Sequence, residues 1–343
     1  MTNWDTLGKN LIFVFSLPRS GSTLLERMIE SHSQICGSAE PHIMVPLRYA
    51  GYYGHAHQAD YDIINSSLGL REFVDRLSNR EEDYLDACRA YAGTLYRKAM
   101  SQKSTSLYFV DKTPPNVLEW QFITRVFPSA NYVVLTRHPV AIFHSFADTF
   151  FMGNYALAQQ EENVLQSYLP ALAEFLREAT IKKISLTYES LVQDPANQMR
   201  RLLEWLGLEY EPSVVAYGHN ERTSTSVGDM VGVHHHDRPV RTSANRWISA
   251  LQSDAHRLHI ARDVVSQLKK EDLSTYGYQK NHLFDNLETA RSGYATTDHS
   301  RRWFSWYLAK RRMYFILRSL ARRTFLGVFL KKVRYFSDVL LRE

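Results

Sequence analysis

The chain has 343 residues, of which 44% are hydrophobic and 13% aromatic, which is enough to bury a large core and excludes a disordered or fibrous protein. The net charge is +5, but residues 301–343 hold twelve Lys and Arg against two acidic residues, so a mildly acidic body carries a strongly basic tail. Residues 1–10 lack the pattern of a secretory signal, no apolar run suggests a transmembrane helix, and Cys36 and Cys88 form neither a metal nor a disulfide pattern, so we expect a cytoplasmic protein.

The first predicted elements are a strand, a loop of small residues and a helix. Residues 11–15 are a continuous apolar run, typical of a strand buried on both faces of a parallel sheet. Residues 16–22 are small and turn-forming, and apolar residues then recur at helical spacing from Thr23 to Ile29. Because N–H groups at a helix N-terminus carry the positive end of the helix dipole, this arrangement predicts an anion site.

The loop differs from that of nucleoside-triphosphate enzymes, whose pattern is G-x-x-x-x-G-K-[ST]. Aligning Gly21 with the second glycine puts Ser16 at the first glycine and Ser22 at the lysine. The lysine that would contact a β- or γ-phosphate is therefore absent, and a cation stands at Arg19 instead. We expect the loop to cradle one phosphate rather than a magnesium-bound triphosphate; the alternative is a helix start that is merely capped by Ser and Thr.

The sequence P-R-S-G-S-T-L-L at residues 18–25 resembles the 5′-phosphosulfate loop of sulfotransferases that use 3′-phosphoadenosine 5′-phosphosulfate (PAPS). It is most similar to the branch that contains the tyrosylprotein sulfotransferases and their bacterial relatives. The resemblance covers roughly residues 10–280 and implies an α/β fold: a parallel sheet flanked by helices on both faces, with the P-loop-like sulfotransferase architecture. It also implies that six consecutive residues hold the 5′-phosphosulfate: Arg19, Ser20, Gly21, Ser22, Thr23 and Leu24.

A carboxylate follows the first helix. The resemblance implies a short second strand with the catalytic base just beyond it, and Glu40 stands at that place. Because an acceptor hydroxyl must lose its proton as it attacks, a carboxylate or imidazole within hydrogen-bond reach is needed. His42 would point the same way in an extended segment and is the second candidate base. For Glu40 the alternative is an exposed loop acid with no role.

Residues 48–105 are rich in tyrosine and then helical in pattern. Two apolar stripes predict helices: Leu70, Phe73, Val74 and Leu77, followed by Tyr84, Leu85, Cys88, Tyr91, Ala92 and Leu95. We expect a helical insertion near the acceptor site that fits the acceptor.

Residues 107–115 predict a second buried strand that ends in a loop. The sequence D-K-T-P at residues 111–114 resembles the sulfotransferase element whose lysine contacts the bridging or sulfonyl oxygens. Lys112 would lie at the carboxyl edge of the sheet, where ligands of open α/β sheets bind. A fixed ammonium there would stabilise the charge that grows on the leaving 5′-phosphate, whereas the alternative is a surface lysine near a turn.

Residues 131–145 repeat the strand–turn–helix design. Residues 132–135 predict a strand, Pro139 suits the first turn of a helix, and Arg137 lies at the strand edge with Ser145 just over two turns later. This arrangement resembles the family's 3′-phosphate site, in which a guanidinium grips the phosphate through two bonds and a serine hydroxyl adds a third. The two motifs in this order are a more specific signal than either motif alone.

Residues 164–178 predict a helix, residues 183–192 a further strand, and the segment before Gly207 an amphipathic helix. The sequence Y-E-x-L-V-x-D-P that begins at Tyr188 is similar to the family's, in which this tyrosine lies beside the adenine. Tyr188 would then stack on the base or hydrogen-bond to it, and the alternative is an ordinary core tyrosine.

Residues 223–247 are too polar for a core and too long for a simple connection, which indicates a functional loop. Related enzymes close a basic loop over the 3′-phosphate here, so Arg238 and Arg241 are the candidates. The three adjacent histidines at 234–236 point in different directions and lack a matching Cys, Asp or Glu cluster, so we expect no metal site.

The chain is thus expected to comprise a sulfotransferase domain at residues 1–285 and a basic, aromatic-rich helical extension at residues 286–343. A basic amphipathic helix at residues 301–343 would lie on an anionic membrane surface, dock an acidic protein such as a carrier protein, or pack on the body. No nucleic-acid module is recognisable, so no nucleic-acid partner is expected.

Together these features predict a PAPS-dependent sulfotransferase that moves the sulfuryl group in line to a hydroxyl or amine acceptor and releases adenosine 3′,5′-bisphosphate without a metal. Two alternatives remain open: a P-loop phosphotransferase, against which the missing lysine counts, and a non-catalytic membrane-surface or scaffold protein on the same fold. No motif identifies the acceptor as a peptide, a sugar, a lipid or a carrier-bound hydroxyl.

Overall fold

The computed structural model describes residues 5–54, 63–161, 164–219 and 237–289, together with Met313 and Phe329. These residues form two compact units: the first holds residues 5–42 and 89–289, and the second holds residues 43–88. Most of the predicted basic tail, and residues 220–236 of the predicted polar loop, lie outside the described residues.

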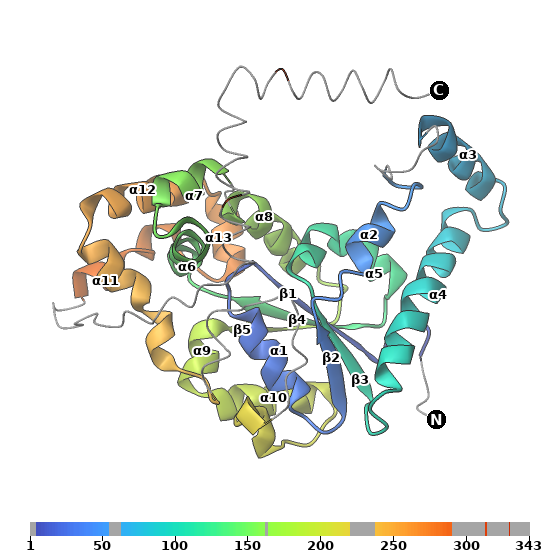
Figure 1. The fold of residues 1–343 in the computed structure, drawn as a ribbon, viewed down its shortest axis with the longest axis horizontal. Helices are drawn as coiled ribbons and strands as arrows, with labels where there is room; N and C mark the ends of the chain where they lie inside the picture. The colour runs from blue at the N-terminus through green and yellow to red at the C-terminus, as the bar shows by residue number, and fades with distance from the viewer. Residues whose placement is uncertain are drawn as a thin grey trace. The chain divides into compact units, whose positions relative to one another are not determined.

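A parallel sheet of five strands is the centre of the first unit (Figure 1). Its strands, in the spatial order β2-β3-β1-β4-β5, are β1 (Leu11–Ser16), β2 (Ile35–Ala39), β3 (Tyr108–Lys112), β4 (Asn131–Thr136) and β5 (Lys183–Thr187). Every pairing between neighbours is parallel. All residues of β1 and β4 are buried, because a continuous apolar run suits a strand that is covered on both faces.

Helices cover both faces of this sheet (Figure 1). One face carries α1 (Ser22–Glu30), α9 (Tyr188–Gln193) and α10 (Pro195–Leu206), and the other is covered by α5 (Trp120–Val126), α8 (Val164–Arg177) and the second half of α4 (Glu81–Met100). The first unit also contains α6 (Pro139–Phe151), α7 (Tyr155–Glu161), α11 (Arg246–Gln252), α12 (Ala255–Ser266), α13 (Lys270–Tyr276) and α14 (Asp285–Thr289). The predicted α/β architecture is therefore confirmed.

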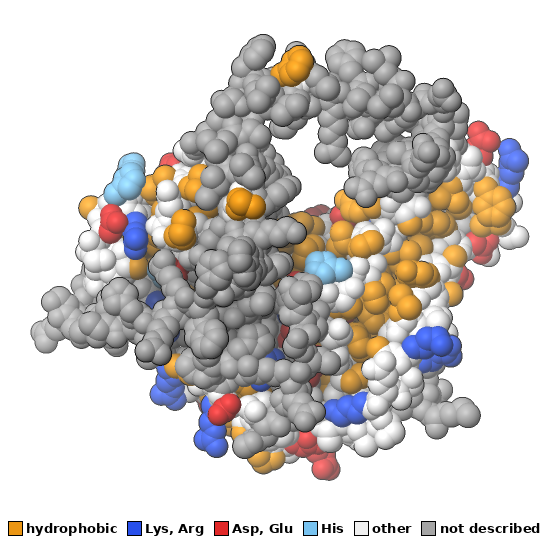
Figure 2. All heavy atoms as spheres, viewed as in Figure 1, with side chains coloured by type: hydrophobic (Ala, Val, Ile, Leu, Met, Phe, Trp, Pro, Cys, Tyr) orange, Lys and Arg blue, Asp and Glu red, His pale blue; other side chains and the backbone are white. Residues whose placement is uncertain are grey.

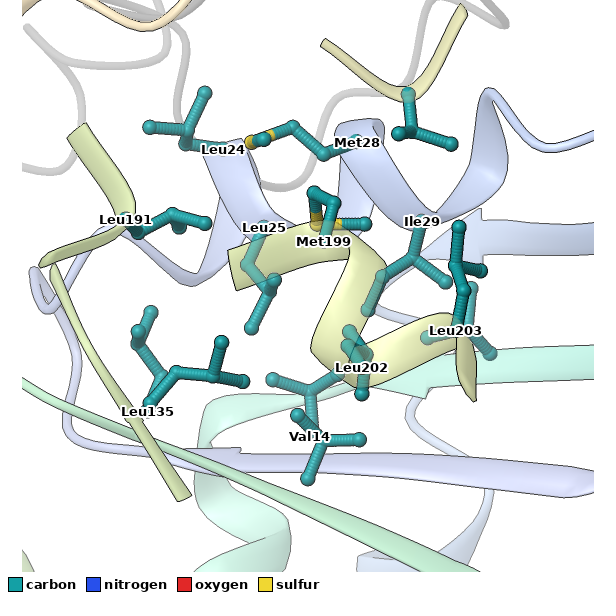
Figure 3. Close-up of a cluster of buried hydrophobic side chains, with 14 of the residues drawn as sticks. Val14, Leu24, Leu25, Met28, Ile29, Leu135, Leu191, Met199, Leu202 and Leu203 are labelled. Atoms are coloured by element: carbon teal, nitrogen blue, oxygen red, sulfur yellow. The ribbon is translucent and has the colours of Figure 1, made fainter. Parts of the chain in front are cut away.

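The two faces of β1 have different cores, because successive side chains of a strand point to opposite faces. Phe13 and Phe15 point to an aromatic cluster, in which the ring centroid of Phe15 is 4.9 Å from that of Phe175. On the other face, Val14 lies under aliphatic side chains of α1, α9 and α10 (Figure 3). This aliphatic packing fixes α1 on the sheet, so the N-terminus of α1 is held at the carboxyl end of β1.

The predicted strand at residues 183–192 is too long. β5 ends at Thr187, and α9 begins at Tyr188. The side chain of Thr187 accepts a hydrogen bond from the N–H of Ser190, which is the pattern of a helix N-cap. Tyr188 is therefore the first residue of a helix that directly follows the strand, rather than a residue within the strand.

The second unit contains α2 (Met44–Arg48), α3 (Ile63–Asp75) and the first half of α4. Both helices predicted between residues 48 and 105 are present, but their apolar stripes are not fully buried. Phe73 of α3 is 62% exposed, and in the part of α4 that belongs to the first unit Tyr91 and Leu95 are 58% and 40% exposed. Hydrophobic side chains are among those visible on the face of the molecule shown in Figure 2. Within the described residues, no helix has the length and hydropathy that a membrane span requires.

Candidate functional site

The turn between β1 and α1 is left-handed at two residues. The φ angles of Arg19 and Gly21 are 69° and 91°. The N–H groups of Leu24 and Leu25 both donate to the carbonyl of Gly21, which leaves the N–H groups of Ser22 and Thr23 without a backbone partner among the described residues. Such donors lie at the start of a nine-residue helix, an arrangement that would suit the anion site that the sequence predicts.

Tyr188 explains why this turn requires a glycine. A Cβ atom on Gly21 would lie 2.3 and 2.5 Å from two ring carbons of Tyr188, closer than packed carbon atoms approach. The same ring lies 4.3 Å from Cζ of Arg137. Tyr188 thus packs between the loop and the guanidinium and joins the two predicted motifs.

Arg137 and Ser145 reach this loop from elements far away in the sequence. Arg137, just after β4, donates from Nη1 to the carbonyl oxygen of Arg19 at 2.9 Å. Ser145, on α6, accepts a hydrogen bond from Nε of Arg19 at 3.2 Å. Burial lowers the pKa of the Arg137 guanidinium from its usual value, but an arginine stays charged at neutral pH. The two motifs therefore place two cations and a hydroxyl at one end of the sheet.

Tyr276 and Glu189 accept hydrogen bonds that hold the backbone of Arg137 and His138 in place. The N–H of Arg137 donates to the hydroxyl of Tyr276 at 3.1 Å, and the N–H of His138 donates to Glu189 at 3.0 Å. Glu189 also accepts a hydrogen bond from the hydroxyl of Tyr278 at 3.0 Å. Tyr276 and Tyr278 belong to no recognisable sequence motif, so sequence analysis could not predict their contacts. For Glu189 the only signal was its position next to Tyr188.

Lys112, the last residue of β3, is the centre of a buried charge cluster. Its Nζ donates to Oε1 of Glu40 at 2.9 Å and to Oγ1 of Thr23 at 3.4 Å, and it lies 3.2 Å from Oε2 of Glu26. Burial alone would lower the pKa of Lys112, but the charges of Glu26 and Glu40 outweigh burial and raise it. Lys112 is therefore a buried ammonium beside the loop, rather than a surface lysine near a turn.

Glu40 and His42 lie on a strained turn after β2. Their φ angles are 49° and 50°, in the left-handed region that costs a residue with a Cβ atom roughly 1–2 kcal/mol. Oε2 of Glu40 lies 3.5 Å from Nε2 of His42, so both candidate bases are in one place. The N–H of His42 donates to Thr113 Oγ1 at 3.4 Å, and that hydroxyl donates to the buried Asp111 at 2.7 Å. The turn is thereby connected to the end of β3 beside Lys112.

Residues 11–212 match the model of the sulfotransferase family. The chain belongs to the sulfotransferase family. It is 24% identical over 247 residues to the nodulation protein NoeE of Sinorhizobium fredii (strain NBRC 101917 / NGR234), covering 64% of this chain and 55% of that protein. It is 23% identical over 271 residues to protein-tyrosine sulfotransferase 1 of Danio rerio, covering 72% of this chain and 68% of that protein. The matched part thus spans little more than half the length of NoeE.

A solved structure similar to this chain is the sulfotransferase domain from the curacin biosynthetic pathway. The two share 21% identity and a TM-score of 0.48, with 75% of this chain and 98% of that chain covered. The five-stranded parallel sheet with its loop after β1 is the P-loop-like fold of the family. The predicted family and fold are confirmed.

The two arginines predicted in the polar loop make a different contact or face solvent. Arg241 donates to the carbonyl of Gln193 at 2.6 Å, at the end of α9, and Arg238 is exposed. Among the described residues, no hydrogen bond or ion pair joins either of them to Arg137 or Ser145. Within the residues that the structure describes, no group of three or more His, Cys, Asp or Glu side chains could hold a metal ion. The three adjacent histidines at 234–236 lie outside the described residues.

Proposed function

We propose that this sulfotransferase transfers the sulfuryl group of PAPS to a hydroxyl or amine acceptor. The observation that carries the proposal is the contact between the two motifs, in which Arg137 donates to the carbonyl of Arg19 and Arg19 donates to Ser145. PAPS is anionic at both its 5′ and 3′ ends. The residues fit those ends: the free amides of the loop and Arg19 suit the 5′-phosphosulfate, and Arg137 with Ser145 suits the 3′-phosphate.

The cluster around Lys112 supplies the groups that sulfuryl transfer needs. The acceptor oxygen forms a bond to sulfur while the bond from sulfur to the 5′-phosphate oxygen breaks, in line with it. Lys112 stabilises the negative charge that grows on the leaving phosphate, and Glu40 takes the proton of the acceptor. His42, 3.5 Å from Glu40, is the second candidate for the proton. The other product is adenosine 3′,5′-bisphosphate.

The acceptor is proposed only as a class. Two of the relatives are named as a protein-tyrosine sulfotransferase and a nodulation protein, and a phenolic or aliphatic hydroxyl suits a carboxylate base in the position of Glu40. An acceptor of this class loses its proton only as its oxygen attacks, which is the step that Glu40 serves.

Calorimetry with adenosine 3′,5′-bisphosphate, followed by transfer from sulfur-labelled PAPS, tests this function. The bisphosphate should bind and raise the unfolding midpoint, because a ligand that binds only the native state stabilises it. Labelled PAPS should then modify at least one member of a panel of peptide, sugar, lipid and carrier-bound hydroxyls, with or without EDTA. If the protein did not bind the bisphosphate but hydrolysed magnesium-bound ATP, it would be a P-loop phosphoryl-transfer enzyme, and the proposal would be wrong.

A further inference from the structure

Glu26 is a buried carboxylate that the proposed reaction does not use. It lies on α1 three residues after Thr23, so the two side chains share one side of the helix. The side chain of Glu26 is 3% exposed, and its Oε1 accepts no hydrogen bond among the described residues. Burial raises the pKa of Glu26 well above its usual range, and the charge of Lys112 acts in the opposite direction. Because a buried carboxylate is costly unless it is paired, Lys112, its ion-pair partner among the described residues, indicates its role.

The Lys112 ammonium can donate three hydrogen bonds and has three close partners. It donates to Thr23 at 3.4 Å and to Glu40 at 2.9 Å, and it forms an ion pair with Glu26 at 3.2 Å. Glu26 is the inner partner, since the side chain of Glu40 is 15% exposed. Burial lowers the pKa of Lys112, and the charges of Glu26 and Glu40 oppose this effect, with the charge of Glu26 the stronger of the two and the hydrogen bond to Glu40 adding to it. Both carboxylates therefore keep the buried amine charged, and Glu26 does so from the inner side.

We infer that Glu26 is a positioning residue for sulfuryl transfer: it holds the Lys112 ammonium, charged and in place, from the inner side of the site. Glu40 is then free to turn from Lys112 to the acceptor while Lys112 faces the leaving phosphate. The use of Lys112 in the reaction rests on the proposed function. The link between Glu26 and Lys112 rests on the geometry of the cluster alone, so the two can be tested separately.

The first test detects the Lys112 ammonium without any nucleotide. In the wild-type protein, ¹H–¹⁵N spectroscopy of the lysine Nζ groups at neutral pH should show a protected ammonium that disappears in Lys112→Arg. Glu26→Gln should make these protons exchange at least tenfold faster. The matched control is Glu30→Gln, because Glu30 is a carboxyl one turn further along α1 that senses the charge of Lys112 but forms no hydrogen bond or ion pair with it among the described residues. The control should change the exchange rate much less than Glu26→Gln does.

The second test separates binding from transfer. Its readouts are the affinity for adenosine 3′,5′-bisphosphate and the release of sulfate from PAPS with water as acceptor. Glu26→Gln should keep the affinity within about threefold and slow sulfate release about tenfold to a hundredfold, the loss typical when the outer partner of a reactive group is removed. A merely structural role would weaken both together. Glu30→Gln should keep the affinity and slow sulfate release much less than Glu26→Gln does.

The results that overturn the inference are distinct from those that overturn the function. The inference about Glu26 would be wrong if the ammonium signal were unchanged in Glu26→Gln. It would also be wrong if Glu30→Gln slowed sulfate release as much as Glu26→Gln does. If the wild-type protein bound no bisphosphate and released no sulfate, the proposed function would be wrong. The ammonium test would still show whether Glu26 holds Lys112. If Glu26→Gln does not fold, the double variant with Lys112→Met should fold again, because both members of the buried pair are removed together. Failure of the double variant would also contradict the inference.

Discussion

Gly21→Ala is the substitution whose effect the structure defines best. An alanine in this left-handed conformation costs roughly 1–2 kcal/mol of folding stability. The new Cβ would also lie 2.3 Å from a ring carbon of Tyr188, and relieving such a clash in a packed site costs about 1–3 kcal/mol more. We therefore expect a loss of about 2–5 kcal/mol in the free energy of unfolding.

Gly207→Ala is the matched control. Gly207 ends α10 with a φ angle of 75°, and a Cβ there would meet nothing within 4 Å. This variant should lose only the backbone cost of roughly 1–2 kcal/mol. Urea unfolding followed by tryptophan fluorescence measures both values, and the difference between them isolates the contact with Tyr188.

The same pair of variants reports on the site. Because the Tyr188 ring also packs against Arg137, displacing that ring should weaken the binding of adenosine 3′,5′-bisphosphate by Gly21→Ala at least tenfold, about 1.4 kcal/mol. Gly207→Ala should bind the bisphosphate as the wild type does. The reasoning would be refuted if both variants were equally stable and bound the bisphosphate equally well.

Three further predictions concern the base, the anchor of Arg137 and pH. Glu40→Ala should keep its affinity for the bisphosphate but lose about 10²- to 10⁴-fold in sulfuryl transfer from PAPS, and undiminished transfer would point to His42 instead. Tyr276→Phe leaves the buried N–H of Arg137 without its acceptor, so urea unfolding should show a loss of about 1–3 kcal/mol with weaker bisphosphate binding, and no change in either would contradict the contact. Burial raises the pKa of Glu30 to about 7, so the folded state binds more protons than the unfolded state between pH 4.5 and about 7. Stability should therefore fall as pH rises through that window, with roughly 3 kcal/mol at most from Glu30, and Glu30→Gln should make the slope shallower although Glu26 also has a raised pKa. A slope as steep as that of the wild type would refute this assignment.

The sheet and the strand–turn–helix form of the two motifs could be predicted because each depends on local sequence. The apolar runs at residues 11–15 and 132–135 suit only strands that are covered on both faces, and β1 and β4 are buried throughout. The strand predicted at 183–192 was too long because Tyr188, Leu191 and Val192 suit either a strand or the buried side of a helix. The Thr187 cap decides between them.

The supporting residues of the site could not be predicted, because their roles depend on tertiary contacts. Glu26 is a charged residue between apolar positions of a helix, a pattern that usually means an exposed side chain, yet it is buried against Lys112. Tyr276 and Tyr278 come about 140 residues after Arg137 and lie beyond the matched family region. The roles predicted for Glu40, Lys112, Arg137 and Tyr188 remain proposals, although the structure brings these side chains to the same end of the sheet.

The most direct test of the central claim compares two ligands that differ only in the 3′-phosphate. Each charge-assisted hydrogen bond contributes about 1.5–3 kcal/mol, so two or more bonds from Arg137 and Ser145 predict that adenosine 3′,5′-bisphosphate binds at least about a hundredfold tighter than adenosine 5′-monophosphate. In Arg137→Ala, calorimetry should show that this preference falls at least about tenfold, because only Ser145 remains to bind the 3′-phosphate, with the affinity for the monophosphate nearly unchanged. A variant that keeps the full preference for the bisphosphate would show that Arg137 does not hold the 3′ end, and the account of this site would be wrong.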